Sequence, residues 1–194
     1  MAESWLVVGL GNPGPRYEAT RHNVGQLVVD ELAARRGVGF KTHKANARVA
    51  ETWLRPGGAK LILAKPNTFM NVSGGPVAGL ARFYGVEPAR VVVVHDELDI
   101  PFDTIKLKAG GGHGGHNGVR DVAKALDSVD FARVRVGIGR PQGRQDPADW
   151  VLQPFGAIER GTLPVLVGDG ADAVEQLIAD GLVAAQQTHH APRD

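Results

Sequence analysis

Apolar residues recur with two different periods along this chain, and the two kinds of segment alternate. Short apolar runs rich in β-branched residues predict strands at residues 5–8, 47–54, 60–64, 91–94, 105–107 and 134–138. Apolar residues three and four positions apart predict helices at residues 24–36, 77–84, 119–126 and 171–182. This alternation predicts an α/β fold: a single domain with a mixed, mostly parallel sheet sandwiched by helices.

Turn residues and chain ends complete the predicted organisation. The turn at residues 55–58, Arg-Pro-Gly-Gly, predicts that the strands on either side of it form a hairpin. The four valines at residues 91–94 are typical of a central parallel strand buried on both faces. We predict a short edge strand at residues 149–152, one catalytic domain over residues 1–185, and a disordered tail over residues 186–194.

Composition narrows the class of protein. A chain of 194 residues that is 43% hydrophobic can bury one good core. No apolar run approaches the roughly 18 residues that a membrane span needs, and the first residues lack the pattern of a secretory signal. The chain has no cysteine, which excludes disulfides and thiolate metal sites. We therefore expect a cytoplasmic protein.

The net charge of +1 hides an asymmetry along the chain. Residues 1–145 hold 20 lysines and arginines against 13 acidic residues, a net charge of +7, whereas residues 146–194 hold 2 against 8, a net charge of −6. Two predicted strands contribute four basic residues that have no acidic residue beside them in the strand: Lys106, Lys108, Arg133 and Arg135. Such a pattern is compatible with a polyanionic partner, and equally with an ordinary solvated surface.

The loop that follows the first predicted strand concentrates polar side chains. Gly9, Gly11 and Gly14 interrupt the apolar run, and hydrogen-bonding residues from Asn12 to Asn23 precede the first helix. The end of a buried strand is a typical place for an active site in an α/β protein.

The glycines at residues 9–14 also match the spacing of a dinucleotide-binding fingerprint. Three features argue against that function. Pro13 removes an N–H from the phosphate-binding turn, the helix begins well beyond Gly14, and the acidic residues Asp30 and Glu31 lie inside that helix. A dinucleotide-dependent enzyme remains a distant alternative.

Few side chains remain for covalent or metal chemistry. There is no cysteine nucleophile and no serine in a Gly-x-Ser-x-Gly elbow. His113 and His116 lie three residues apart in a glycine-rich loop, which rarely makes a metal site alone.

A histidine and a carboxylate do follow two different strands, His22 and Asp96. A carboxylate that accepts the Nδ1–H of an imidazole fixes its tautomer, so the other nitrogen can take a proton from water. The amides of Asn12, Asn71 and Asn117 can donate hydrogen bonds to a developing oxyanion or to substrate. A structural role for His22, and helix capping by Asn71, are the competing interpretations.

Five long motifs in these regions resemble the bacterial-type peptidyl-tRNA hydrolases. They are GLGNPGPRYEATRHNVG at 9–25, KPNTFMNVSGGPV at 65–77, HDELDIP at 95–101, KLKAGGGHGGHNGVRDV at 106–122 and FARVRVGIGRP at 131–141. The resemblance spans about Trp5 to Phe155. It implies a monomeric, metal-free and cofactor-free α/β enzyme that cleaves the ester between a peptide's C-terminus and the 3′-terminal ribose of tRNA, recycling tRNA from prematurely released peptidyl-tRNA.

The resemblance also assigns roles to residues of this chain. His22 matches the catalytic base, Asp96 its carboxylate partner, and Asn12 the amide beside the base. The substrate-binding positions match Tyr17, Met70, Asn71, His116 and Asn117. Lys108 and Arg135 match the basic pair that grips the 5′-phosphate of tRNA. The main rival hypothesis is a non-catalytic RNA-binding module on the same fold, which would not need His22, Asp96 and the three asparagines.

Overall fold

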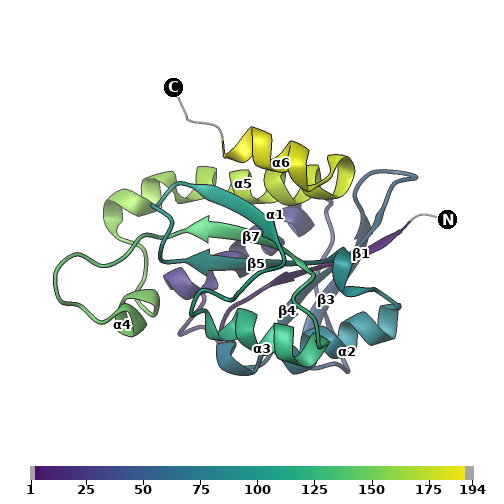
Figure 1. Cartoon of the computed structure of the whole chain (residues 1–194), viewed down its shortest axis with the longest axis horizontal. Coiled ribbons are helices and arrows are strands. Elements are labelled where there is room, and N and C mark those ends of the chain that lie inside the picture. The colour runs from purple at the N-terminus through teal and green to yellow at the C-terminus, as the bar shows by residue number, and fades with distance from the viewer. Residues whose placement is uncertain (1–2, 191–194) are drawn as a thin grey trace.

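The computed structural model describes residues 3–190, which form a seven-stranded sheet with helices on both faces (Figure 1). The strands are β1 (Ser4–Gly9), β2 (Lys41–His43), β3 (Ala47–Trp53), β4 (Lys60–Pro66), β5 (Val91–Glu97), β6 (Ile105–Ala109) and β7 (Ala132–Gly137). The α-helices are α1 (Val24–Arg35), α2 (Gly74–Tyr84), α3 (Asn117–Leu126), α4 (Pro147–Val151), α5 (Ala157–Asp180) and α6 (Leu182–His189). Short 3₁₀ turns are η1 (Arg21–Asn23), η2 (Met70–Val72) and η3 (Pro88–Arg90).

The strand order is β2-β3-β4-β1-β5-β7-β6. The four central strands β4, β1, β5 and β7 run parallel, while β3 and β6 pair antiparallel with their neighbours and β2 pairs antiparallel with β3. The predicted mixed, mostly parallel sheet is therefore confirmed, as are the hairpin β3–β4 and the buried central strand β5.

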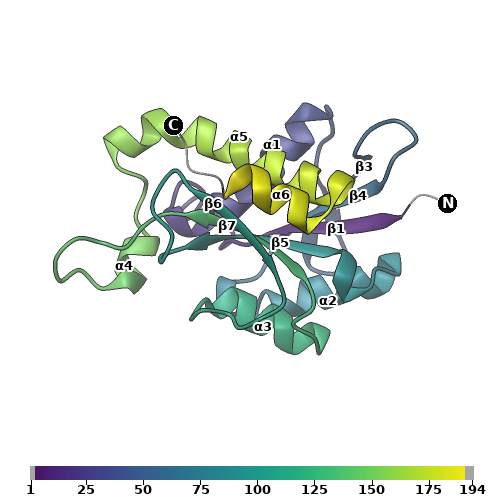
Figure 2. The same cartoon turned by 45° about the horizontal axis from the view of Figure 1, so that its top comes forward.

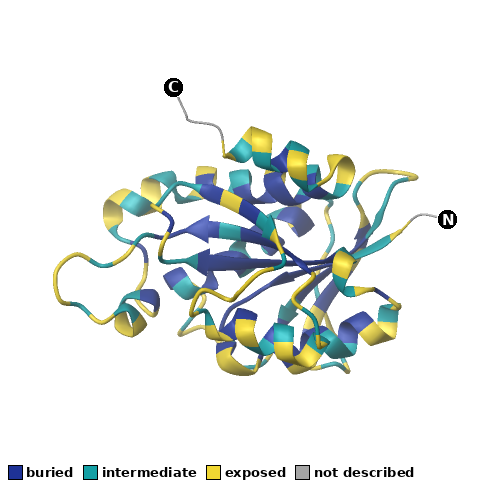
Figure 3. Cartoon of the chain, viewed as in Figure 1, coloured by how far each residue is buried: buried dark blue, intermediate teal, exposed yellow. Residues whose placement is uncertain are grey.

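Two hydrophobic cores lie on the two faces of the sheet. In Figure 2, α1, α5 and α6 cover one face and α2 and α3 cover the other. The central strands are buried on both sides, as Figure 3 shows, because neighbouring valines of β5 alternate between the two cores. Phe155 and Leu166 add to the first core, and Phe131 to the second.

Between β1 and β5 the order in which strands are added to the sheet changes direction. The chain leaves β1 toward β4 through α1, and it leaves β5 toward β6 and β7 on the other side. A crevice therefore forms beyond the carboxyl ends of β1 and β5, where α/β proteins bind ligands. The hydrogen bond from Leu10 N–H to Val94 carbonyl (3.0 Å) continues the contact of the two strands into this region.

Two glycines bring η1 and α1 close to the sheet at that point. A Cβ on Gly9 would overlap the carbonyl of Gly25, and a Cβ on Gly25 would overlap the carbonyl of Val94. Side chains at either position would push α1 away from β1 and β5. Gly25 thus lets the chain segment that carries His22 lie directly against the end of β5.

The structure corrects three expectations. Residues 149–152 form no edge strand, because Pro147–Val151 is the helix α4, capped by the Asp146 side chain, which accepts from Ala148 N–H. The second correction is to the helix predicted from residue 171, because α5 begins earlier, at Ala157. In addition, the structure contains the short strand β2, which the sequence did not predict.

The third correction concerns the chain's end. Residues 186–189 belong to α6 rather than to a disordered tail, because α6 packs on α5 and its side chains bond to β6. The rest of the predicted tail, residues 191–194, lies outside the described part of the chain. Between residues 3 and 190, no helix combines the length and apolar character that crossing a membrane requires.

Candidate active site

A cavity of about 480 Å³ lies in the crevice beyond β1 and β5. It is formed by the first loop, by η2, by the glycine-rich loop before α3, and by α4. Its lining residues are Asn12, His22, Phe69, Met70, Asn71, Asp96, Glu97, Leu98, Gly114, Gly115, His116, Asn117, Pro147, Ala148, Val151 and Leu152. Seven of the residues singled out from the sequence therefore meet in one cavity: Asn12, His22, Met70, Asn71, Asp96, His116 and Asn117.

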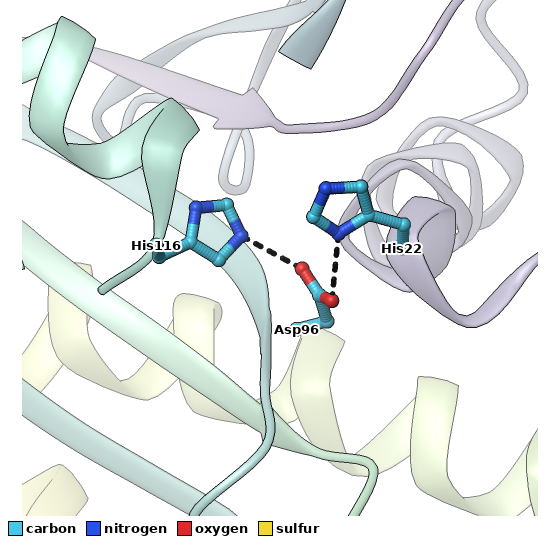
Figure 4. Close-up of side chains that lie close together, drawn as sticks. All are labelled: His22, Asp96 and His116. Atoms are coloured by element: carbon cyan, nitrogen blue, oxygen red, sulfur yellow. Dashed lines mark hydrogen bonds and ion pairs between the residues drawn. The ribbon is translucent and has the colours of Figure 1, made fainter. Parts of the chain in front are cut away.

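Asp96 joins two histidines at the floor of this cavity. Its Oδ2 lies 2.8 Å from Nδ1 of His22, and its Oδ1 lies 2.7 Å from Nε2 of His116. In Figure 4 the carboxylate lies between the two rings, and the second ring nitrogen of His22 points away from it. The Asp96 side chain is only 2% exposed, so water does not compete for these bonds.

The hydrogen bonds fix which ring nitrogen of each histidine carries a proton. Val119 N–H donates to Nδ1 of His116 (3.2 Å), so a neutral His116 holds its proton on Nε2 and donates it to Asp96. His22 likewise donates from Nδ1 to Asp96, which leaves its Nε2 as an acceptor. His22 is thus in the tautomer that a general base needs.

The same contacts shift the pKa values of the pair. Burial would lower the pKa of His22, but the charge and hydrogen bond of Asp96 outweigh burial and raise the pKa above its ordinary value. Burial would raise the pKa of Asp96, but His22 and His116 outweigh it and hold the pKa well below its usual range. Asp96 is therefore an anion that stabilises the protonated form of His22.

A third histidine supports the site from within the sheet. His95 is fully buried on β5, and its ring centroid lies 4.7 Å from that of His116. Burial lowers the pKa of His95 to about 3. His95 thus stays neutral and adds no positive charge behind His116.

Asn12 is held in one orientation by its neighbours. Its backbone N–H donates to Asn23 Oδ1, its carbonyl accepts from Asn23 Nδ2, both at 2.9 Å, and its side-chain Oδ1 accepts from Met70 N–H at 2.7 Å. These bonds leave the Asn12 side-chain NH₂ as the group that can donate into the cavity. The sequence did not single out Asn23, which is 1% exposed and positions Asn12 rather than lining the cavity.

Aromatic and amide side chains form the rim of the cavity. Tyr17 is not a lining residue, but its ring packs edge-on against Phe69, with the centroids 6.3 Å apart. Phe69 is 57% exposed and lines the cavity, although the sequence did not single it out. Asn117 is the first residue of α3, so it lies at the positive end of that helix dipole.

The α4 wall of the cavity was missed because residues 149–152 were expected to be a strand. Arg21, next to His22, fixes this wall in place. Its guanidinium lies 3.4 Å from the ring centroid of Trp150, and it also bonds to the Trp150 carbonyl (3.3 Å) and to Glu159 (2.8 Å). The wall and His22 are therefore parts of one packed unit.

The predicted basic cluster divides into two kinds of residue. Arg133 is 1% exposed, and its guanidinium donates to the carbonyls of Gly111, Gly112 and Val129. The expectation that Arg133 forms part of a phosphate-binding surface is therefore wrong, because its charge is used to hold the glycine-rich loop.

Lys108 and Arg135 are half-buried on that face, and Lys108 Nζ also donates to the Gly112 carbonyl (3.0 Å). The pKa of Lys108 is lowered by burial and then by the charges of Arg133 and Arg135. Two cations this close repel each other, so an anion placed between them would be stabilised.

His22, Asp96 and His116 are the one group of three in the described part of the chain whose ligand atoms lie close enough to hold a metal, within 4.8 Å of one another. Their hydrogen bonds do not suit that role. The nitrogen that His116 would offer carries a proton, because its other nitrogen accepts from Val119 N–H. The donor set is arranged to share protons.

Comparisons with known proteins show the family of this chain. The family model described as peptidyl-tRNA hydrolase matches residues 6–194. The chain belongs to the peptidyl-tRNA hydrolase family. It is 66% identical over 190 residues to the peptidyl-tRNA hydrolase of Leifsonia xyli subsp. xyli, covering 98% of both chains, and 62% identical to that of Pseudarthrobacter chlorophenolicus, covering 98% and 97%.

Solved structures of the family share the fold. The crystal structure of peptidyl-tRNA hydrolase from Acinetobacter baumannii superposes with a TM-score of 0.89 at 34% identity, covering 100% of this chain and 97% of the other. The family match extends beyond the motifs recognised in the sequence, which ended near Phe155, and includes α5 and α6.

Proposed function

We propose that this member of the peptidyl-tRNA hydrolase family cleaves the ester between a peptide's C-terminal carbonyl and the 3′-terminal ribose of tRNA, with His22 as general base. The observation that carries the proposal is the bond from His22 Nδ1 to Asp96, which leaves Nε2 of a cavity-lining histidine free to accept a proton. In this proposal the protein is a cytoplasmic monomer, and its activity recycles tRNA from prematurely released peptidyl-tRNA.

The reaction needs one proton to move twice. Nε2 of His22 takes a proton from water as the water oxygen forms a bond to the ester carbonyl carbon. The carbonyl oxygen becomes an oxyanion, and Asp96 stabilises the imidazolium of His22. The carbon–ribose oxygen bond then breaks, and the imidazolium returns its proton to the leaving ribose oxygen.

Uncharged donors suit the negative charge that develops on the carbonyl oxygen. The Asn12 side chain offers N–H groups held in place by Asn23 and Met70, and the N-terminus of α3 at Asn117 adds a positive dipole. Asn71, next to Met70 on η2, also lines the cavity and can bond to the peptide. A ribose alkoxide leaves more readily than an amine, so a base and donors can suffice without a metal or a covalent nucleophile.

The peptide side of the cavity favours blocked substrates. Met70, Val151 and Leu152 present apolar surface near the base, where burying the free α-ammonium of an aminoacyl-tRNA is costly. A peptidyl or N-acetyl group replaces that charge by a neutral amide. We therefore expect N-blocked substrates to be preferred.

The direct test is to incubate the purified protein with N-acetyl-aminoacyl-tRNA and with free aminoacyl-tRNA, both in the presence of EDTA. Cleavage of the blocked substrate is expected, with little cleavage of the free one. Loss of cleavage on adding EDTA would contradict the metal-free mechanism. Binding of tRNA with no cleavage of either substrate would favour a non-catalytic RNA-binding module.

The acid limb of the pH–rate profile should report His22. Only the neutral imidazole accepts a proton, and Asp96 raises the pKa of His22, so kcat/KM should fall as the pH drops through a value above about 6.5. The measurement is kcat/KM for N-acetyl-aminoacyl-tRNA as a function of pH. A rate that stays constant down to pH 5 would show that another group is the base.

Lys108 and Arg135 are proposed to hold the 5′-phosphate of tRNA. Lys108→Ala or Arg135→Ala should raise KM for N-acetyl-aminoacyl-tRNA by roughly tenfold each, because each removes a charged hydrogen bond. The salt dependence of tRNA binding should become less steep by about one unit of slope for each lost contact.

A short N-acetyl-aminoacyl nucleotide ester is the control, since it lacks the 5′-phosphate and should be cleaved at unchanged KM. Equal losses on the long and short substrates would contradict the phosphate-binding role of the two residues.

A further inference from the structure

The edge strand β6 is completed by side chains instead of by another strand. Leu107 lies in the middle of β6 and turns its backbone N–H and carbonyl away from β7. Its N–H donates to Nε2 of His190 at 2.8 Å, and its carbonyl accepts from Nε2 of Gln186 at 3.1 Å. Gln186 and His190 are one helical turn apart at the end of α6, so together they satisfy both groups of one strand residue.

Helix α6 is itself held firmly against the protein. Ala185 is fully buried in the core shared with α5. Gln176 of α5 donates from one amide to Thr188 Oγ1 (2.8 Å) and to the Ala184 carbonyl (3.4 Å). The contact between α6 and β6 is therefore between two fixed elements, and it restrains the edge strand.

The restrained residue lies between two lysines of the basic face. Leu107 is flanked by Lys106 and Lys108, and in the sheet Lys106 lies opposite Arg135. The end of α6 is close to these charges, because His190 accepts from the N–H of Leu107, and burial and then the charges of Lys106 and Arg135 lower the pKa of His190. Lys108 thus lies on a strand that β7 holds on one side and α6 on the other.

We propose that Gln186 and His190 are positioning residues for tRNA, which hold β6 in place so that Lys108 and Arg135 bind one phosphate together. The inference rests on the phosphate-binding role proposed above. Neither residue touches the reacting atoms, so their loss should change KM for tRNA and leave kcat unchanged. The effect should be confined to substrates that carry the phosphate.

The experiment compares matched variants on matched substrates. Gln186→Leu removes the bond to the Leu107 carbonyl, whereas Gln187→Leu makes the same change at the exposed next position. His190→Phe removes the acceptor for Leu107 N–H, whereas His190→Gln supplies an oxygen acceptor in its place. Each variant is assayed with N-acetyl-aminoacyl-tRNA carrying a 5′-phosphate, with the same tRNA after phosphatase treatment, and with a short N-acetyl-aminoacyl nucleotide ester.

The expected result is a KM for 5′-phosphorylated tRNA raised roughly fivefold by Gln186→Leu and by His190→Phe, with unchanged kcat. Gln187→Leu and His190→Gln should stay near the parent protein, and none of the variants should affect the other two substrates. Amide hydrogen exchange at Leu107 should become faster in Gln186→Leu and His190→Phe only.

Two results would overturn the proposal. One is an equal rise of KM on phosphorylated and dephosphorylated tRNA. The other is an unchanged KM in Gln186→Leu and His190→Phe while Lys108→Ala raises it. If Lys108→Ala also left KM unchanged, the phosphate-binding pair itself would be wrong and the positioning role would fall with it, whereas cleavage of the short ester would still support His22 as base. If Gln186→Leu fails to fold, the comparison of His190→Phe with His190→Gln decides the question.

Discussion

His22→Ala is expected to lower kcat for N-acetyl-aminoacyl-tRNA by a factor on the order of 10²–10⁴, which is the usual contribution of a general base. The affinity for tRNA should be retained, because the proposed phosphate contacts lie on β6 and β7, away from His22. The measurement is single-turnover cleavage together with tRNA binding to the same variant. Single-turnover conditions separate the chemical step from product release.

A histidine away from the cavity provides the control for His22→Ala. His43 lies on β2 at the opposite edge of the sheet, so His43→Ala should leave kcat unchanged. Hydrolysis by His22→Ala at the parent rate would show that another group activates the water.

Asp96→Asn should be about as damaging as His22→Ala, with kcat lowered by a factor on the order of 10³–10⁴. The reason is a forced tautomer. Val119 N–H keeps the proton of His116 on Nε2, so the introduced amide must turn its carbonyl oxygen toward His116 and its NH₂ toward His22. His22 Nδ1 then has to accept, which moves the ring proton to Nε2 and blocks proton transfer from water.

The pH–rate profile distinguishes this effect from a loss of folding. Without the negative charge of Asp96, the pKa of His22 should fall, so the acid limb of the residual activity should shift to lower pH. Asp99→Asn is the matched control, because Asp99 follows the same strand but is exposed and pairs with Arg140 at 2.7 Å. Near-normal activity of Asp96→Asn would show that the carboxylate does not orient the base.

Hydrophobic periodicity predicted most of the sheet and the helices that cover it. The four valines that begin β5 form an uninterrupted β-branched run, and the turn at residues 55–58 separates the apolar runs of β3 and β4, so both patterns indicated strands. The pattern was weakest in short elements. In α4, five residues cannot show a helical period, although Asp146 followed by Pro147 is a helix-start signal that could have been used.

Polar residues were harder to place than apolar ones. His22 and Asp96 were paired from the sequence because each follows a strand, and the structure brings them together. Arg133 and Arg135 look equivalent in the sequence, yet one is buried under three carbonyls. The difference depends on the path of the glycine-rich loop, which no local pattern encodes. In the same way, residues 186–189 form a helix whose stabilising partners, in α5 and β6, are distant in sequence.

The position of β1 between β4 and β5 has a consequence for biosynthesis. This strand is made first, but one of its neighbours consists of residues 91–97, so its pairing is complete only after half of the protein has been synthesised. His22 is synthesised early, before Asp96 and His116. The hydrogen bonds from Asp96 to His22 and to His116 can therefore form only after residue 116 has been made. A growing chain therefore has no assembled cluster of His22, Asp96 and His116 while its N-terminal third is being made.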